Sequence, residues 1–326
     1  MTTQGAVAGK DGAVKLLEVE LPPMSDTRVR VKMLIGGVSC GTEADAASGV
    51  ATYMNRPFLT GYQAVGRVVE VGRLVSAVKP GDIVATDGGS LWKMDSLFGG
   101  SHAKEAVCEE GRLIKLDPKT ASLPTAAYAM LAAVGYEAVS RMKPKPESVL
   151  AVFGLGMLGQ MAGKIGQLLG LRVIGVNRSK WKCDAAKNFG FDAVCAPDGD
   201  ALRKAVKSIG GKEIRYILDT TGKQALFDLA VDTIAPFGEL SLAGYHSEKF
   251  TVDFDLCHRK NLTIHNPVGP GKNLPAVVKL INQGKFNIES LIRHHVLPGD
   301  ISKFYSDLIK HHSDYLGVVI DWSDAG

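Results

Sequence analysis

Hydrophobic and polar positions follow two different repeats along the chain, and the change between them comes near residue 120. Residues 29–39, 64–71, 82–88 and 102–116 are short alternating or β-branched runs that Gly, Pro and Asp turns separate. Such runs are typical of β-strands. The chain up to about residue 118 is therefore predicted to form a β-rich barrel or sandwich.

Helical spacing replaces this alternation from Ser122 onward. Small and apolar side chains recur at the spacing of a helix over residues 122–142, and the segment KPKPES at 143–148 ends the run. After it, strands are expected at 148–154, 172–177, 192–196, 214–222 and 239–244, with helices at 156–170, 179–190, 199–210 and 223–238. Short strands joined by helices predict right-handed crossovers and a parallel sheet. The chain is expected to end with a helix at 273–285, a strand at 291–297, a helix at 300–312 and a strand at 316–322.

Length and composition narrow the class of protein. At 326 residues the chain is too long for one ordinary core, so two domains are expected. Hydrophobic residues make up 45% and charged residues 22%, as is usual for a folded globular protein. The 38 basic and 34 acidic residues are spread along the chain without a basic run, which argues against a nucleic-acid partner.

The cysteines and the apolar runs bear on where the protein acts. Its five cysteines are odd in number and form no C-x-x-C pair, so neither a disulfide framework nor a structural zinc knuckle is expected. The N-terminal segment lacks the basic and apolar regions of a secretion signal, and no stretch approaches the roughly 18 apolar residues of a membrane span. We expect a cytoplasmic protein that acts on a small-molecule substrate and not at a membrane.

A glycine-rich motif follows the first strand of the predicted parallel sheet. Gly154, Gly156 and Gly159 form G-x-G-x-x-G at the start of a helix. The first glycine permits a tight turn, the second lets the backbone approach a pyrophosphate, and the third lets helix and strand pack closely. With Met157 and Leu158 between the glycines, the segment is predicted to bind a dinucleotide. The alternative is that the glycines serve only the turn.

The end of the next strand indicates which dinucleotide binds. An NAD site would place Asp or Glu there to accept a hydrogen bond from the ribose 2′-hydroxyl, but this chain has Asn177, followed by Arg178, Ser179 and Lys182. These groups donate to a 2′-phosphate, which a carboxylate would repel. NADP(H) is therefore favoured. NAD(H) remains the alternative if Arg178 is a solvated charge at the start of a helix.

Further cofactor contacts are expected by topology. The carboxyl ends of parallel strands face the ligand crevice of such sheets. Thr220, Gly244 and Tyr245 stand at the ends of two later strands, so we expect them to contribute to the cofactor site.

Two short motifs now resemble those of a known family. The segments CGTE (40–43) and GYQAVGRV (61–68), followed by the glycine motif, resemble the medium-chain dehydrogenase/reductase superfamily over essentially the whole chain. In its zinc alcohol dehydrogenases the corresponding segments read C-G-T-D and G-H-E-x-x-G-x-V. Here Tyr62 and Gln63 stand at the histidine and acidic positions, and the third ligand position falls near Met130.

The resemblance implies an organisation and a metal content. It implies an α/β protein with a GroES-like catalytic domain at 1–121, a doubly wound Rossmann domain at 122–270, and a C-terminal return at 271–326 that completes both. Only Cys40 remains of the zinc ligands, and one thiolate cannot hold a tetrahedral site. The four-cysteine structural lobe is absent as well. The chain looks most like the zinc-lacking branch that includes the bacteriochlorophyllide hydroxyethyl dehydrogenases, and a homodimer is expected from a long strand near the C-terminal part of the Rossmann sheet.

Without zinc, another group must stabilise or protonate the developing alkoxide. Tyr62 is the first candidate because it occupies the position of a lost ligand, and the alternative is that its ring only fills the vacated volume. Thr42 matches the hydroxyl that relays protons in the zinc enzymes, although it could instead cap a turn or a helix. Glu43 matches an acidic position behind the metal and could orient Tyr62 or a basic side chain, or be structural.

Substrate contacts are expected from three further residues. Cys40 could touch the substrate or serve as a small buried apolar group. His102 could reach the cleft or be an ordinary core or surface histidine. Trp92, with Met94 and Phe98, could form an apolar wall or only pack. The pairs His294–His295 and His311–His312 have no matching ligands nearby in the sequence and are expected to be solvated.

Taken together, these features predict a zinc-independent NADP(H)-dependent oxidoreductase that interconverts a secondary alcohol and a ketone on a small or medium organic substrate. One alternative is an NADPH-dependent reductase of the C=C bond of an enone or quinone. The other is a non-catalytic NADPH-binding protein. The sequence does not separate the first two, and the retained hydroxyls of Thr42 and Tyr62 argue against the third.

Overall fold

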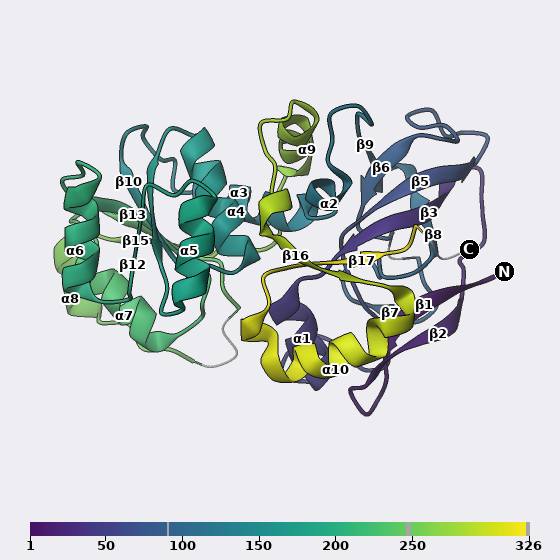
Figure 1. The fold of residues 1–326 in the computed structure, drawn as a ribbon, viewed down its shortest axis with the longest axis horizontal. Coiled ribbons are helices and arrows are strands. Elements are labelled where there is room, and N and C mark those ends of the chain that lie inside the picture. Colours follow the sequence, from purple (N-terminus) through teal and green to yellow (C-terminus); the bar gives the residue numbers. More distant parts are fainter. Residues whose placement is uncertain (90, 246–248, 324–326) are drawn as a thin grey trace. The chain divides into compact units, whose positions relative to one another are not determined.

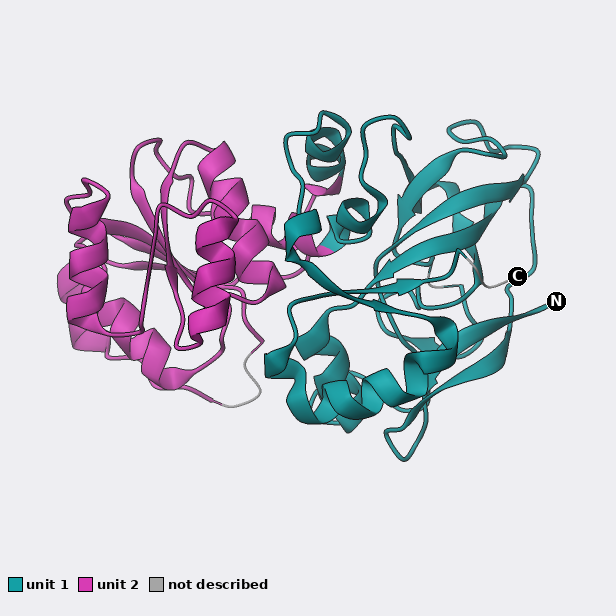
Figure 2. Cartoon of the chain, viewed as in Figure 1, with its two compact units in different colours: residues 1–130, 275–326 teal, residues 131–274 magenta. Residues whose placement is uncertain are grey.

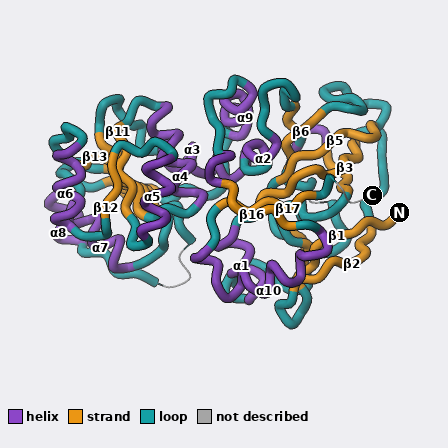
Figure 3. Tube along the Cα trace, viewed as in Figure 1, coloured by secondary structure: helices purple, strands orange, loops and turns teal. Residues whose placement is uncertain are grey.

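The computed structural model describes residues 1–89, 91–245 and 249–323. The chain forms two compact units, unit 1 with residues 1–130 and 275–326 and unit 2 with residues 131–274 (Figure 2). Unit 1 is rich in β-strands, and unit 2 alternates strands and helices (Figure 3). The expected α/β fold with a β-rich first part and a parallel second part is confirmed.

Unit 1 contains two sheets (Figure 1). The four-stranded sheet has the order β2-β1-β4-β7, with β1 (Thr2–Ala8), β2 (Val14–Glu20), β4 (Phe58–Leu59) and β7 (Asp95–Ser96). The seven-stranded sheet has the order β16-β17-β3-β5-β6-β9, and β8 pairs with β3. Its strands are β3 (Arg28–Gly37), β5 (Ala64–Val71), β6 (Ile83–Thr86), β8 (Glu105–Glu109), β9 (Ile114–Lys115), β16 (Ile292–Val296) and β17 (Gly317–Asp321).

The alternation in β3 explains which face of this sheet packs against the core. Val29, Val31 and Met33 are buried, while Arg30 and Lys32 between them are partly exposed. Successive side chains of a strand point to opposite faces, so one face of β3 supplies the core and the other carries the charges. The predicted β-rich architecture rests on this repeat.

The helices of unit 1 include one that the sequence pattern did not reveal. Helix α1 (Cys40–Ser48) begins at the first residue of the CGTE motif, for which a turn or a helix cap was the alternative to a proton-relay role of Thr42. Its buried alanines pack inward, and Gly49 ends it with φ of 82°, the left-handed conformation that suits glycine. The first turn of α1 thus carries Cys40, Thr42 and Glu43. The other helices are α2 (Leu123–Ala126), α9 (Leu274–Asn282) and α10 (Ile301–His311), with 3-10 turns at Glu110–Arg112, Glu289–Leu291, Pro298–Asp300 and His312–Asp314.

The unit boundaries differ from those predicted at 121/122 and 270/271. The helical run expected at 122–142 is broken into α2 and α3 (Ala129–Ser140), and unit 1 extends to Met130. The hydroxyl of Tyr128 donates to the carbonyl oxygens of Val38 and Val318 and accepts from the Val318 N–H. These bonds hold the segment between the two helices to unit 1. The KPKPES segment lies within unit 2.

The C-terminal segment from Pro275 belongs to unit 1, whereas it was expected to complete both domains. Its strand β17 pairs antiparallel with β3, and β16 pairs parallel with β17. Trp322 and Tyr305, which come from this segment, are fully buried in the core of unit 1. The end of the chain therefore supplies part of that core.

Unit 2 is built around a six-stranded parallel sheet of order β12-β11-β10-β13-β14-β15. This is the doubly wound order, whose reversal lies between β10 and β13. The strands are β10 (Val149–Phe153), β11 (Arg172–Val176), β12 (Ala193–Cys195), β13 (Ile214–Asp219), β14 (Glu239–Leu242) and β15 (Thr263–His265). The helices that accompany them are α4 (Met157–Leu168), α5 (Lys180–Asn188), α6 (Gly199–Ser208), α7 (Gln224–Thr233) and α8 (Phe254–Lys260).

The strands at the C-terminal edge of this sheet are shorter than the strand on which the homodimer prediction relied. The last strand, β15, has three residues, and β14 has four, so the expected long strand is absent from the described part of unit 2. Pro267 follows shortly after β15 and lacks the N–H that would continue a strand. The homodimer itself stays a prediction.

Among the described residues no helix has the length and apolar character needed to cross a membrane.

Candidate functional site

The glycine motif forms a tight turn between β10 and α4 in unit 2. Gly154 has φ of 93°, and a Cβ at Gly159 would lie 1.9 Å from the Gly154 carbonyl oxygen. Both positions therefore require glycine. At Gly156 a Cβ would meet nothing within 4 Å, so the backbone before α4 faces open space. Met157 and Leu158 begin α4 directly after it, where unpaired N–H groups can receive a phosphate.

The ends of β13 and β14 lie beside this turn. The Thr220 hydroxyl donates to the carbonyl oxygens of Phe153 and Gly154, at 3.0 and 3.1 Å. The N–H of Gly244 donates to the Asp219 carbonyl oxygen, and a Cβ there would meet the Thr220 backbone at 2.6 Å. Tyr245, next in the chain, is exposed. The structure thus brings Thr220 and Gly244 together beside the glycine turn, and Tyr245 follows them in the chain.

The predicted ribose-binding residues lie at the end of β11 and the start of α5. Asn177 accepts from the Ser179 N–H at 2.8 Å, and Ser179 precedes α5 without a capping bond from its hydroxyl. The Arg178 side chain is exposed, and among the described residues its guanidinium has no hydrogen bond or ion pair. Lys182 lies over the Trp181 ring, with Nζ 5.2 Å from the ring centroid. Arg178 and Ser179 thus offer donors at the start of a helix.

In unit 1, Tyr62 lies on the turn that follows β4. Gly61 has φ of 81°, and a Cβ there would collide with the His102 ring. The Tyr62 side chain is 7% exposed. Burial raises the pKa of its phenol well above the ordinary value of 10.0, while side-chain hydrogen bonds with Ser39 and Thr42 oppose this rise. The phenol is therefore a proton donor at neutral pH, held by two hydroxyls from the start of α1.

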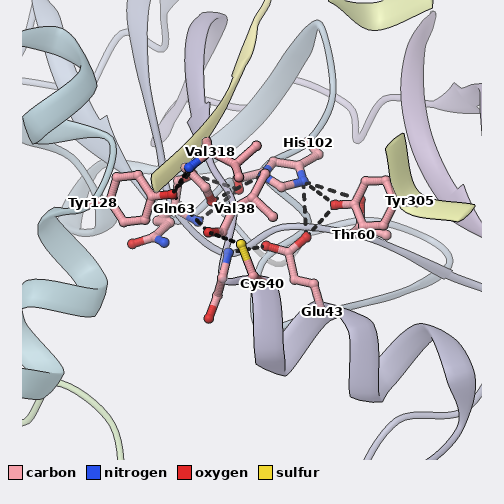
Figure 4. A network of polar contacts seen from close by, with 12 residues as sticks. Val38, Cys40, Glu43, Thr60, Gln63, His102, Tyr128, Tyr305 and Val318 are labelled. Atoms are coloured by element: carbon pink, nitrogen blue, oxygen red, sulfur yellow. Dashed lines mark hydrogen bonds and ion pairs between the residues drawn. The ribbon is translucent and has the colours of Figure 1, made fainter. Parts of the chain in front are cut away.

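Glu43 lies in a buried polar cluster behind this turn (Figure 4). One carboxylate oxygen accepts from the Ser39 N–H at 2.9 Å, and the other accepts from the Tyr305 hydroxyl. His102 Nδ1 lies 3.0 Å from the Tyr305 hydroxyl and 3.4 Å from Glu43 Oε2. Burial is the largest cause that raises the pKa of the Glu43 carboxyl, and His102 and Tyr305 lower it. Glu43 thus bonds the backbone of Ser39, and its charge adds to the rise of the Tyr62 pKa.

His102 occupies a different place from the one expected of a substrate contact. Its ring is fully buried between Gly36 and Gly61, and Nε2 faces the Gly37 carbonyl oxygen at 3.3 Å. A ring with no exposed surface cannot touch a substrate in this structure, and His102 is better described as part of the buried cluster. The exposed pair His294–His295 is solvated as expected.

Trp92 also differs from the expectation. It is 9% exposed, and its indole N–H donates to the Gly99 carbonyl oxygen at 2.9 Å, so it stabilises its own loop. The exposed aromatic residue of this loop is Phe98, at 56%. Its ring packs edge to face on Tyr62 and stacks on Tyr53, each with centroids 5.7 Å apart. Phe98 rather than Trp92 presents an apolar surface beside Tyr62.

Cys40 is half-buried at the start of α1, which leaves both its predicted contact with the substrate and the alternative of a packing role open. Its thiol lies 3.6 Å from the Leu316 carbonyl oxygen and 3.9 Å from that of Val38. With Tyr62 and Met130 it marks the positions at which the resemblance would place zinc ligands. A protonated phenol and a thioether are not zinc donors, so these residues do not fit a catalytic zinc ion. Within the described ranges no group of three or more His, Cys, Asp or Glu could hold a metal ion.

The candidate site includes two residues that sequence reasoning did not identify. Ser39 contacts Tyr62 and Glu43, and its only signal was its place directly before the CGTE motif. Tyr305 contacts Glu43 from α10, 262 positions along the chain. No local pattern marks such a residue, because only the fold brings it to α1.

Comparison with known proteins gives the same two parts. Residues 25–118 match the alcohol dehydrogenase GroES-like domain, and residues 158–283 match the family described as zinc-binding dehydrogenase. An alcohol dehydrogenase of Geobacillus stearothermophilus is 27% identical over 299 residues, covering 83% of this chain and 86% of the relative. The 2-desacetyl-2-hydroxyethyl bacteriochlorophyllide A dehydrogenase of Rhodobacter capsulatus is 25% identical over 303 residues, covering 90% of each chain.

A solved structure shares the complete fold. A zinc-binding dehydrogenase of Sinorhizobium meliloti 1021 bound to NADP aligns with a TM-score of 0.86 at 16% identity, covering 98% of this chain and 99% of that one. Together with the doubly wound sheet, its glycine turn and the β-rich unit 1, these matches agree with the predicted family. The chain belongs to the medium-chain dehydrogenase/reductase superfamily and is an NAD(P)-dependent oxidoreductase.

Proposed function

We propose that this protein is a zinc-independent, NADP(H)-dependent oxidoreductase that interconverts a secondary alcohol and a ketone on a small or medium organic substrate. The observation that carries the proposal is Tyr62, a buried and protonated phenol at the position of a zinc ligand. The alcohol dehydrogenase among the relatives supports the reaction class. A homodimer in the cytoplasm remains part of the proposal.

The chain's own residues supply the proton, stabilise the group that loses it and return a proton to that group. A bound nicotinamide supplies or accepts the hydride. In the direction of reduction, Tyr62 donates its proton to the carbonyl oxygen, which becomes the alcohol. Ser39 and Thr42 then hydrogen-bond the phenolate that remains, and Thr42, which is partly exposed, is the hydroxyl through which solvent returns a proton. Such general acid catalysis contributes about 10²–10⁴-fold to rate.

The substrate pocket is proposed to include Phe98 and the half-buried thiol of Cys40. Phe98 offers an exposed aromatic face directly against the Tyr62 ring. An apolar substituent of the substrate would pack on this face while the carbonyl oxygen approaches the phenol. This suits an organic ketone better than a highly charged substrate.

The preference for NADP(H) is supported by the guanidinium of Arg178 and the hydroxyl of Ser179, neither of which has a hydrogen-bond partner among the described residues. Both lie where a ribose 2′-phosphate would meet the start of α5. Asn177, which replaces the carboxylate of NAD sites, introduces no repulsion. The glycine turn at 154–159 with Thr220, Gly244 and Tyr245 is proposed to hold the rest of the dinucleotide.

The function is tested by following NADPH oxidation over a panel of ketones and enones. Turnover of ketones supports the proposal. Turnover of enones alone would replace it with C=C reduction, and tight NADPH binding without any turnover would favour a binding protein.

Zinc independence gives a first prediction. Purified protein is expected to contain only substoichiometric zinc, and dialysis against EDTA should leave kcat unchanged, because Tyr62 and Met130 do not supply the ligands that a tetrahedral site needs. Elemental analysis and steady-state kinetics before and after dialysis check this. A stoichiometric zinc ion whose removal abolishes turnover would contradict it.

The raised pKa of Tyr62 gives a second prediction. The group donates while protonated, so ketone reduction should lose no rate through its ionisation until the pH exceeds the ordinary value of 10.0. Alcohol oxidation needs the phenolate, so its rate should rise with pH up to the same value. The measurement is kcat in both directions against pH, with Tyr62→Phe as the baseline. A decline in reduction below pH 10 that disappears in Tyr62→Phe would refute the assignment.

A further inference from the structure

Three aromatic rings of unit 1 lie against one another beside the turn that carries Tyr62. Tyr53 lies between α1 and β4, Tyr62 follows β4, and Phe98 follows β7, and β4 pairs parallel with β7. The Phe98 ring stacks on Tyr53 at an interplanar angle of 23° and meets Tyr62 edge to face at 78°, with centroids 5.7 Å apart in each pair. Aromatic pairs prefer such separations and angles, so the three rings form one aromatic cluster.

Two of the three rings are open to solvent. Phe98 is 56% exposed and Tyr53 is 41% exposed, whereas Tyr62 is 7% exposed. Isolated exposed apolar side chains are common on protein surfaces and need no explanation. Here two exposed aromatic rings stack on each other, and one of them also contacts the ring whose phenol is proposed to donate the proton. The pair therefore offers apolar surface next to the group that is proposed to act on the substrate.

The backbone of Phe98 is held in an unfavourable conformation. Its φ is 49°, in the left-handed region that bulky residues rarely adopt. Leu97 before it is fully buried, and its N–H donates to the Leu59 carbonyl oxygen at 2.9 Å. After it, a Cβ at Gly99 would lie 1.9 Å from the Asp87 carbonyl oxygen. Backbone strain persists where the surroundings impose it, and it clusters at ligand sites, so the exposed position of Phe98 points to a binding role.

The glycines after Phe98 pack closely against the rest of the loop. The Trp92 indole N–H donates to the Gly99 carbonyl oxygen at 2.9 Å. A Cβ at Gly100 would lie 2.9 Å from the same indole nitrogen and 2.7 Å from the Leu59 side chain. This packing leaves the backbone that follows Phe98 little room to move. A ring that is already held in place loses little conformational freedom when a ligand packs on it.

The contact between Phe98 and Tyr62 indicates which part of a ligand would cover the exposed rings. In the proposed reaction the carbonyl oxygen of the substrate accepts the proton of Tyr62, so a substituent on the carbonyl carbon is within reach of the Phe98 ring. A saturated substituent would gain only from the apolar area that it buries. An aromatic substituent would gain in addition from an offset or edge-to-face contact with the rings. The aromatic cluster therefore favours an aromatic substituent over a saturated one of the same size.

We infer that Phe98 and Tyr53 form an aryl-binding subsite, and that the substrate is an aryl alkyl ketone or the corresponding benzylic secondary alcohol. The inference rests on the proposed function and names the substrate class of the same site. Reduction adds the hydride of the nicotinamide to the carbonyl carbon and the proton of Tyr62 to the carbonyl oxygen, and the aryl group is unchanged. Phe98 and Tyr53 determine specificity and take no part in the proton transfer.

Kinetics with two matched ketones test the subsite in the full chain. Acetophenone and cyclohexyl methyl ketone differ in whether the ring is aromatic or saturated, and the ratio of their kcat/KM values is compared between variants so that their intrinsic reactivities cancel. Phe98→Leu should lower this ratio about 2–10-fold, the value of an aromatic contact, and Tyr53→Leu should lower it as well. Phe98→Tyr keeps a ring and should retain the ratio. A ratio that stays at the wild-type value in both leucine variants would overturn the inference.

Binding without turnover separates the subsite from the proposed reaction. Benzamide and cyclohexanecarboxamide carry the same two rings beside a carbonyl group that the enzyme does not reduce, and their dissociation constants are measured by NMR titration of the full chain. The preference for benzamide should fall about 2–10-fold in Phe98→Leu. If no ketone is turned over, the proposed function fails, and these constants still decide whether the subsite exists. A preference that is the same in the wild type and in Phe98→Leu would overturn the subsite.

Phe254→Leu is the matched control. Phe254 is also an exposed phenylalanine, at 76%, and its ring stacks on His258 with centroids 5.7 Å apart. It lies in α8 of unit 2 and not in the aromatic cluster of unit 1, so its loss should leave both ratios at their wild-type values. A fall as large as that in Phe98→Leu would show that the loss of any exposed ring has this effect, and it would refute a specific aryl-binding subsite.

Discussion

Replacing Tyr62 by phenylalanine is expected to lower kcat for ketone reduction by about 10²–10⁴-fold, the usual contribution of a general acid. The substitution removes the hydroxyl that is proposed to donate the proton and keeps the ring that packs on Phe98. NADPH affinity should be unchanged, because Tyr62 lies in unit 1, whereas the glycine turn and the residues proposed to bind the 2′-phosphate lie in unit 2. Steady-state kinetics with NADPH and a cofactor titration measure the two effects.

Tyr216→Phe provides the control for this experiment. Tyr216 is also a buried tyrosine, and its hydroxyl accepts from the Lys145 N–H in unit 2, so its loss should affect stability and leave kcat close to that of the wild type. Wild-type turnover in Tyr62→Phe would mean that the ring only fills the space of a lost metal ligand.

Replacing Arg178 by alanine is expected to weaken NADPH binding by about 10–100-fold, because hydrogen bonds to charged groups contribute about 1.5–3 kcal/mol. NADH lacks the 2′-phosphate and should bind with nearly unchanged affinity. The guanidinium has no partner among the described residues that its removal would leave unpaired. Dissociation constants for both nucleotides, measured by fluorescence titration, give the selectivity directly.

Lys187→Ala tests whether the effect is specific. Lys187 is a basic residue in the last turn of the same helix, α5, so its removal changes the net charge equally at the opposite end. It should alter NADPH and NADH binding alike and only slightly. Equal losses for both nucleotides in Arg178→Ala would refute the contact with the 2′-phosphate.

The elements that the sequence predicted best are those whose signals are local. The strands and helices between 148 and 244 follow the expected order because buried parallel strands are continuous apolar runs, such as β10 at Val149–Phe153. The glycine turn was recognised because G-x-G-x-x-G is a short local motif, in which Gly154 has a positive φ and Gly159 packs against the Gly154 carbonyl. Helix α1 was missed because its small alanines give a weak amphipathic pattern.

The unit boundary was less predictable for a related reason. The helical spacing over 122–142 continues through the point where the chain passes from unit 1 to unit 2. Side-chain bonds help to keep this segment with unit 1, among them those of Tyr128 to Val38 and Val318 and of Thr125 in α2 to Ile288. Such contacts leave no periodic signal.

By itself, the sequence determined the two-part organisation, the dinucleotide turn and the replacement of histidine and acid by Tyr62 and Gln63, because residue types and short spacings carry these features. Only the tertiary structure decided that His102 lies inside unit 1, that Phe98 rather than Trp92 is exposed beside Tyr62, and that Tyr305 bonds Glu43. The physical reason is distance along the chain. Hydrogen bonds between residues 262 positions apart depend on how sheets and helices pack, and no local pattern encodes that packing.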